Sequence, residues 1–170
     1  DDERYLETYW RNIPGMWVHG DLALRRADGN FFMVGRSDDT LKVAGKRLGP
    51  AEVEEIVLEL PDVAEAAAIG FADADKGQKL VVFVVRHPDS RANDADLEKT
   101  VMAHVDKRLG RPFRPSAVHR VSQLPKTRSS KIMRRVIRSV YSNTPPGDLS
   151  SLDNPAALDD IRAAAASASA

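Results

Sequence analysis

The fold is decided by residues 63–85, which read VAEAAAIGFADADKGQKLVVFVV. Apolar and β-branched residues dominate Val63–Phe71 and Lys79–Val85, whereas residues 73–77 between them are mostly polar and end in glycine. Apolar runs of this length, bounded by turn residues, are typical of buried strands. The stretch therefore predicts two strands of a central sheet, joined by a polar turn.

Helical patterns flank these strands on both sides. Pro50 follows a glycine at a position where a helix can begin, and apolar residues then recur at the helical period. A second helix is expected to begin at Asn93 or Asp94 and to end before Gly110. The pattern predicts an α+β domain with a central three-stranded sheet flanked by helices. The remaining expected elements are a third strand at residues 117–121 and a last helix at residues 132–141.

The first 37 residues predict a separate small unit. A helix is expected near residues 1–10, and the apolar runs 22–25 and 31–34 lie on either side of an Asp-Gly pair, which is a strong hairpin signal. Residues 36–40 are polar and show no periodicity, so a domain boundary is expected there.

Composition restricts the classes of function. Lys plus Arg and Asp plus Glu number 25 each, so no net field draws the molecule to nucleic acid, an anionic membrane or acidic substrates. The absence of cysteine excludes thiolate nucleophiles and cysteine metal ligands, and it fits a cytoplasmic location. No apolar run approaches the roughly 20 residues of a membrane helix. The four histidines show no ligand spacing, so no metal site is expected: His19, His87, His104 and His119.

Three strings, in this order, identify a family. They are GMWVHGD at residues 15–21, GRSDDTLKVAGKRLGPAEVE at residues 35–54 and LPKTRSSKIMRR at residues 124–135. Together they resemble the adenylate-forming superfamily, and in it the AMP-forming acyl-CoA synthetases. The string GDLSSLDNP, residues 147–155, is further similar to the end of acetyl-CoA and acetoacetyl-CoA synthetases.

The resemblance implies a division of labour along the chain. Residues 1–37 would end an N-terminal adenylation domain, residues 38–39 would be a hinge, residues 40–143 a mobile C-terminal lid and residues 144–170 a tail whose order the sequence leaves open. The first residues are neither a signal peptide nor an initiator methionine, so the chain is expected to be cut from a longer protein. The parent enzyme would join a short carboxylic acid such as acetate to ATP and then to CoA. ATP, CoA and Mg²⁺ would be held mainly by the missing domain, and the fragment alone would be inactive.

The resemblance assigns nucleotide contacts to three residues. Asp21 would hold the AMP ribose, Arg36 would lie beside the nucleotide and Arg47 would reach its phosphates. A lone Gly-Asp pair is more often an ordinary turn, and an arginine is more often a surface cation. The surrounding strings favour the nucleotide interpretation.

The resemblance assigns the catalytic role to Lys131. Its ammonium would lie between the substrate carboxylate and the α-phosphate and stabilise the charge that develops there. Asp38 would be the pivot of the lid, while Ala44 and Gly45 would line the tunnel for CoA. Arg108 would bind a CoA phosphate, although a cation near a helix C-terminus is also favoured by the helix dipole.

The sequence departs from the family directly before this lysine. The family usually has glycine there, but this chain has Ser130. If the position requires a positive φ, serine would strain the loop by about 1 kcal/mol.

Two further readings concern the same loop. The family lysine is often controlled by reversible acetylation, so a protein lysine acetyltransferase and a deacetylase are expected partners of Lys131. Taken alone, the basic run at residues 126–138 also fits a nucleic-acid or protein docking surface. The preceding strings favour the synthetase, with a small carboxylic acid as substrate and with no nucleic-acid or membrane partner.

Overall fold

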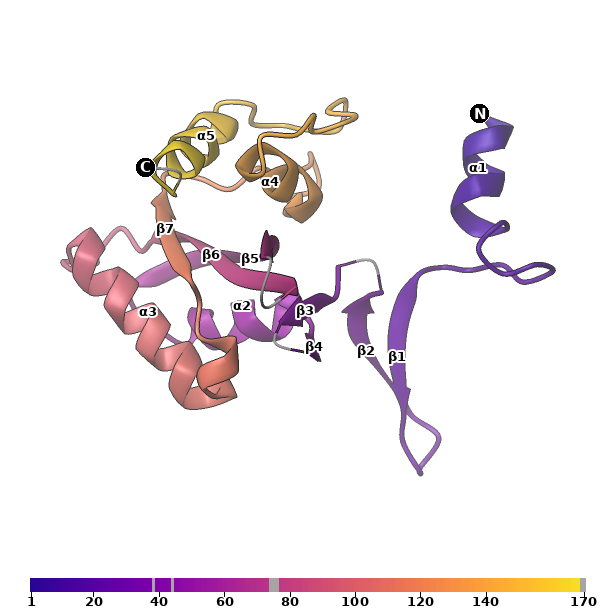
Figure 1. Ribbon diagram of the computed structural model, residues 1–170, viewed down its shortest axis with the longest axis horizontal. Helices are drawn as coiled ribbons and strands as arrows, with labels where there is room; N and C mark the ends of the chain where they lie inside the picture. Colours follow the sequence, from indigo (N-terminus) through magenta and orange to yellow (C-terminus); the bar gives the residue numbers. More distant parts are fainter. Residues whose placement is uncertain (38, 44, 74–76, 169–170) are drawn as a thin grey trace. The chain divides into compact units, whose positions relative to one another are not determined.

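The computed structural model describes residues 1–37, 39–43, 45–73 and 77–168 (Figure 1). The chain divides into two compact units, Asp1–Asp38 and Asp39–Ala170. The proposed pivot Asp38 and the proposed tunnel residue Ala44 lie outside the described residues.

The first unit is a short helix followed by a hairpin. The helix is α1 (Asp2–Tyr9), and the antiparallel strands are β1 (Asp21–Arg25) and β2 (Phe31–Arg36). The Asp-Gly turn that the sequence predicts joins the two strands, with Gly29 at φ +88°. No described side chain of this unit is buried, and Leu24, Phe31 and Met33 are among its exposed apolar residues. The unit therefore has no core of its own among the described residues.

The second unit is built on one mixed sheet. The three expected strands are confirmed as β5 (Val63–Asp73), β6 (Gly77–Arg86) and β7 (Ala117–Val121). Strand β6 pairs with β5 in antiparallel register and with β7 in parallel register. A short hairpin of β3 (Leu41–Val43) and β4 (Lys46–Leu48) extends the sheet from the start of β6, in the order β4-β3-β6-β5.

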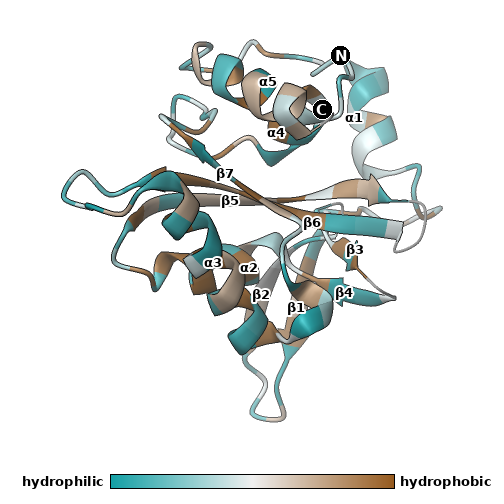
Figure 2. Cartoon of the chain, turned by 60° about the vertical axis from the view of Figure 1, so that its left-hand side comes forward, coloured by the Kyte–Doolittle hydropathy of each residue, from teal (hydrophilic) through white to brown (hydrophobic). Residues whose placement is uncertain are grey.

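Helices cover both faces of this sheet, so the unit has three layers (Figure 1). On one face lie α2 (Pro50–Leu58) and α3 (Asp94–Leu109), and on the other lie α4 (Arg134–Tyr141) and α5 (Ala157–Ala168). Strand β6 serves both cores by alternation: Val82 and Val84 face the first pair of helices, whereas Val81 and Phe83 face the second. Burial on both faces explains the continuous apolar run of the sequence, which Figure 2 shows as a brown strip through the middle of the unit.

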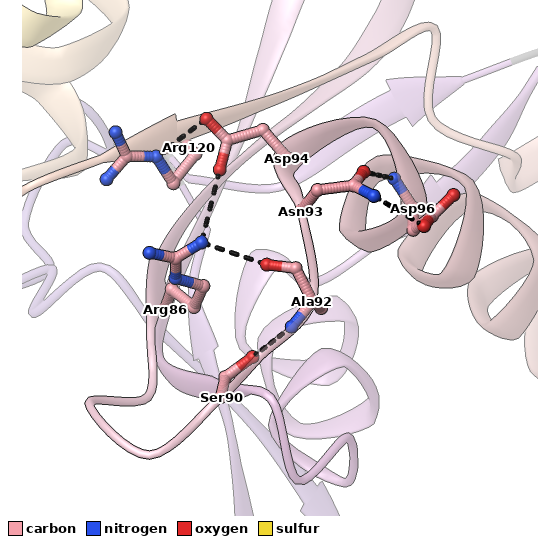
Figure 3. A network of polar contacts seen from close by, with 7 residues as sticks. All are labelled: Arg86, Ser90, Ala92, Asn93, Asp94, Asp96 and Arg120. Atoms are coloured by element: carbon pink, nitrogen blue, oxygen red, sulfur yellow. Dashed lines mark hydrogen bonds and ion pairs between the residues drawn. The ribbon is translucent and has the colours of Figure 1, made fainter.

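The polar connection from β6 to α3 fixes the start of the helix (Figure 3). The side chain of Asn93 accepts a hydrogen bond from the backbone N–H of Asp96 at 2.9 Å and donates one to its carboxylate at 2.7 Å, which confirms the expected cap. Asp94 forms ion pairs with Arg86 at 3.7 Å and with Arg120 of β7 at 3.0 Å. The cap therefore also ties α3 to two strands.

The C-terminal tail is an integral part of the second core. Helix α5 buries Leu158 and Ile161 against β7 and α4. Asp160 accepts hydrogen bonds from the backbone N–H of Ser122 at 2.6 Å and from its hydroxyl at 2.5 Å, and these bonds lower the pKa of Asp160. The order that the sequence left open is thus resolved for residues 144–168. Over the described ranges, no helix is both long and apolar enough to cross a membrane.

Candidate functional site

Asp21 and Arg36 face each other at the open end of the hairpin. They are directly opposite in the β1–β2 register, and Arg36 Nη1 lies 3.5 Å from Asp21 Oδ1. Arg36 also donates to the backbone oxygen of His19 at 2.9 Å, and the imidazole of His19 contacts the Asp21 carboxylate. The register therefore brings two of the expected nucleotide residues together.

A pocket lies beside Arg36, and the missing side chain of Gly20 leaves room for the Arg36 guanidinium at its wall. Gly20 has φ +86°, and a Cβ added there would lie 2.9 Å from the guanidinium of Arg36. Ser37 closes the same end, because its N–H and hydroxyl both donate to the oxygen of Gly20, at 2.8 and 2.9 Å. The pocket is lined by Thr8, Asn12, Val18, His19, Gly20, Arg36 and Ser37.

Lys131 lies in a tight hairpin between β7 and α4. Lys126 and Ile132 form an antiparallel bridge, and the backbone N–H of Thr127 donates to the oxygen of Lys131 at 2.9 Å. The N–H of Lys131 in turn donates to the hydroxyl of Thr127 at 3.2 Å. Both backbone groups of Lys131 are thereby held, while its side chain is exposed.

Ser130 has a positive φ, which is the conformation expected to strain a serine at this position. Its φ is +62°, and its N–H donates to the oxygen of Thr127 at 2.8 Å. This is a turn followed by one left-handed residue, a hairpin geometry in which glycine is preferred at that last position. The family glycine thus has a conformational reason, and Ser130 is strained here.

The basic run 126–138 is partly neutralised. Lys126 Nζ donates to Glu65 at 2.6 Å, and Arg134 is bound to the buried carboxylate of Glu54. By contrast, the ammonium of Lys131 has no hydrogen bond or ion pair to any described residue. Lys131 is therefore available to a ligand, as is Arg128, which is also exposed in this loop.

The other expected CoA and phosphate residues lie on separate elements. Gly45 occupies the β3–β4 turn at φ +76°, and Arg47 is exposed on β4 opposite Lys42. Arg108, in the last turn of α3, is ion-paired with Glu59, which also contacts His104 at 2.9 Å. Hydrogen bonds from His104 and then Arg108 lower the pKa of Glu59. A phosphate at Arg108 would therefore compete with an existing partner.

Residues 52–131 match the family model of the AMP-binding enzyme C-terminal domain. This segment, residues 52–131, belongs to that family. The chain is 45% identical over 169 residues to propionate–CoA ligase of Escherichia coli, covering 96% of this chain and 27% of that protein. It is 40% identical over 164 residues to acetyl-coenzyme A synthetase of Pyrobaculum aerophilum, covering 96% and 24%. The chain thus spans about a quarter of the length of these relatives.

A solved structure has the same fold. Acetoacetyl-CoA synthetase from Streptomyces lividans matches with a TM-score of 0.81 and 27% identity, over 98% of this chain and 25% of that chain. The α+β expectation is confirmed by this likeness and by the family model.

Sequence reasoning missed the partners that hold the lysine loop of this AMP-binding C-terminal domain. Asn154, Glu54 and Glu65 were not singled out, because each pairs with a residue far away in the chain. Within the described ranges, no group of three His, Cys, Asp or Glu side chains is arranged to hold a metal ion.

Proposed function

We propose that the chain is the C-terminal part of an AMP-forming acid–CoA ligase that activates a short-chain carboxylic acid. In the first half-reaction, a carboxylate oxygen of the acid attacks the α-phosphorus of ATP, and pyrophosphate leaves. In the second, the thiol of CoA attacks the acyl carbon, and AMP leaves. The names of the relatives, which are ligases for propionate and acetate, support this class of acid.

Lys131 would serve the first half-reaction. An ammonium held at the tip of a rigid loop adds positive charge where oxygen and phosphorus approach each other, and such preorganised charge stabilises the transition state more than the ground state. The carrying observation is the Lys131 hairpin, in which backbone bonds fix the loop while the ammonium has no partner among the described residues.

Asp21, Arg36 and Arg47 fit a nucleotide. A carboxylate can accept hydrogen bonds from the two ribose hydroxyls, and guanidinium groups match phosphate oxygens. The pocket beside Arg36 and Gly20 supports this assignment. Mg²⁺ would accompany the nucleotide phosphates, with its protein ligands outside this chain.

The second half-reaction would use another part of the lid. Gly45 lacks a side chain in an exposed turn, which permits close approach of a ligand, and with Ala44 it would line the path of CoA. Arg108 would bind a CoA phosphate after releasing its present partner, Glu59. Asp38 would be the pivot that presents first Lys131 and then this strand.

The decisive experiment is Lys131→Ala in the full-length enzyme. Acid-dependent exchange of pyrophosphate into ATP should fall by about 10² or more, whereas thioester formation from supplied acyl-adenylate should largely survive. Asp38→Pro should also separate the two half-reactions by restricting the pivot. Equal loss of both half-reactions in Lys131→Ala would refute the assignment of Lys131 to adenylation.

The same exposed lysine favours regulation by acetylation, which would remove its charge. The side chain of Lys126 is occupied by Glu65, and Lys79 by Asp73, while Lys131 is accessible. Because Lys42, Lys46, Lys99 and Lys107 are exposed as well, selectivity would come from recognition of the loop: a lysine acetyltransferase that recognises such synthetases should modify the chain chiefly at Lys131, and a deacetylase should restore it. Mass spectrometry after limited reaction tests this, and modification spread evenly over Lys42, Lys76, Lys99 and Lys126 would contradict it.

The structure supports nucleic-acid binding by the basic run 126–138 less well than it supports the synthetase function. Two of its cations are bound to carboxylates, which lowers the charge available for phosphates. Binding of duplex or single-stranded DNA that weakens steeply with salt would support it nonetheless.

A further inference from the structure

Residues 152–154 of the C-terminal tail pair with the segment that leads into the Lys131 hairpin. Thr127 forms an antiparallel bridge with Leu152, and the backbone N–H of Asp153 donates to the oxygen of Lys126 at 2.9 Å. The N–H of Lys126 donates to the side-chain oxygen Oδ1 of Asn154, also at 2.9 Å. Both backbone polar groups of Lys126 are therefore satisfied by the tail, five residues before Lys131.

Asn154 uses its whole carboxamide on this segment. Its Nδ2 donates to the backbone oxygen of Leu124 and to Oε1 of Gln123, each at 2.9 Å, while Oδ1 accepts from Lys126. Because the N–H of Lys126 needs an acceptor and the two oxygens need a donor, the carboxamide can satisfy all three groups in one orientation only. Aspartate would place a negative charge against two oxygens, and alanine would leave all three groups without this partner.

The tail is anchored independently of Asn154. Leu158 and Ile161 of α5 are buried in the core under α4, and Asp160 binds the N–H and hydroxyl of Ser122. Loss of the Asn154 amide should therefore leave α5 in place. It should loosen only the connection between the anchored tail and residues 123–127.

We propose that Asn154 is a positioning residue for Lys131, and that the tail thereby sets the geometry of adenylation. This proposal rests on the proposed role of Lys131. An ammonium stabilises a transition state only where it is held, and a displacement of about 1 Å can lower a rate by about 10². Asn154 fixes the strand that leads into the hairpin, so its loss should misplace the ammonium without removing it.

The test compares Asn154→Ala with Asp153→Ala in the full-length enzyme, using acetate or propionate with ATP. Asp153 is the matched control, because its exposed side chain makes no hydrogen bond or ion pair with a described residue and its backbone bond survives the substitution. In Asn154→Ala, kcat of pyrophosphate exchange should fall about tenfold or more, while the KM for ATP and thioester formation change less than about twofold. Asp153→Ala should match the wild type in both half-reactions.

A double variant separates positioning from general damage. If Asn154 acts through Lys131, Asn154→Ala should cause no further loss of pyrophosphate exchange in a Lys131→Ala background. A further loss there, or equal loss of both half-reactions in the single variant, would overturn the proposal. Should Asn154→Ala fail to fold, Asn154→Ser, which removes the Nδ2 donor and shortens the side chain, carries the same comparison.

The two proposals fail in different ways. If Lys131→Ala leaves pyrophosphate exchange intact, the proposed function is wrong. If Lys131→Ala abolishes exchange while Asn154→Ala equals the wild type, the positioning role alone is wrong. Hydrogen exchange on the chain itself adds a direct readout: the amide of Lys126 should exchange faster in Asn154→Ala, whereas that of Ile161 should stay protected.

Discussion

Arg134, at the start of α4, donates two hydrogen bonds to the carboxylate of Glu54 in α2, and thus joins helices on opposite faces of the sheet. The pair also contacts the edge strand β5, because Oε1 of Glu54 accepts a hydrogen bond from the backbone N–H of Ala68 at 2.9 Å. The N–H of Ala68, which could otherwise pair with a strand of another molecule, is therefore already hydrogen-bonded. The hydrogen bonds that Arg134 donates to Glu54 raise the pKa of Arg134, and Asp39 lies 3.8 Å from the same guanidinium.

Replacing Glu54 by alanine should destabilise the chain by about 3 kcal/mol, because a half-buried guanidinium and the N–H of Ala68 lose their partner. Urea unfolding of the chain measures the change. Glu55→Ala, one residue along the same helix but exposed, should cost less than about 0.5 kcal/mol. Similar losses in the two variants would show that the pair does not hold the helices together.

Ser130→Gly should stabilise the chain by about 0.5–1 kcal/mol, because glycine relieves the left-handed strain but adds freedom to the unfolded chain. The matched control is Asn143→Gly, also at positive φ, where asparagine is tolerated at the end of α4 and the gain should be near zero. Chemical unfolding decides between them. A loss of stability in Ser130→Gly would mean that the serine side chain contributes something that the strain argument omits.

His119 should make stability depend on pH. Burial lowers its pKa, and its Nε2 lies 3.0 Å from the hydroxyl of Tyr141. The unfolded chain therefore binds the proton at a higher pH than the folded chain, so this contribution is fully present above about pH 6.5 and is lost as the pH falls below it. His119→Gln, which does not titrate but can still bond Tyr141, should flatten this slope, measured by unfolding between pH 7 and 5. The exposed His87→Gln is the control, and equal flattening by both variants would argue against a special role for His119.

Removing the first unit should cost little stability. No described side chain of residues 1–37 is buried, whereas the second unit holds two cores. Residues 39–170 should therefore unfold cooperatively with the same midpoint as the whole chain, and residues 1–38 alone should show no cooperative transition. Thermal unfolding followed by circular dichroism is sufficient, and a clearly lower midpoint for the shortened chain would contradict the division.

The elements that the sequence predicts well are those with local signals. Proline at the start of α2, the Asn93 cap and Gly110 after α3 each act on their own few residues. The sequence predicts that α4 begins at Ile132, which is too early, because the apolar spacing does not reveal that Ile132 pairs with Lys126 instead. The helix begins at Arg134.

The tail escaped prediction for a related reason. Its sequence is rich in Ala, Ser and Asp, and its few apolar residues, such as Leu158 and Ile161, are buried by a core that the rest of the domain supplies. The same limit applies to the candidate site. Lys131 could be named from its string, but the partners that hold its loop lie 28 to 80 positions away in the chain and depend on the finished fold.

The dependence of the lysine loop on Asn154 also orders events during synthesis. Residues 123–133 leave the ribosome before residues 149–161, so the hairpin emerges without the segment that completes it. The sheet and its first pair of helices can already be assembled at that time, because their contacts lie earlier in the chain. A chain interrupted before the tail would keep the lysine and much of the domain, yet the hairpin that carries the lysine would lack its contacts with residues 152–154.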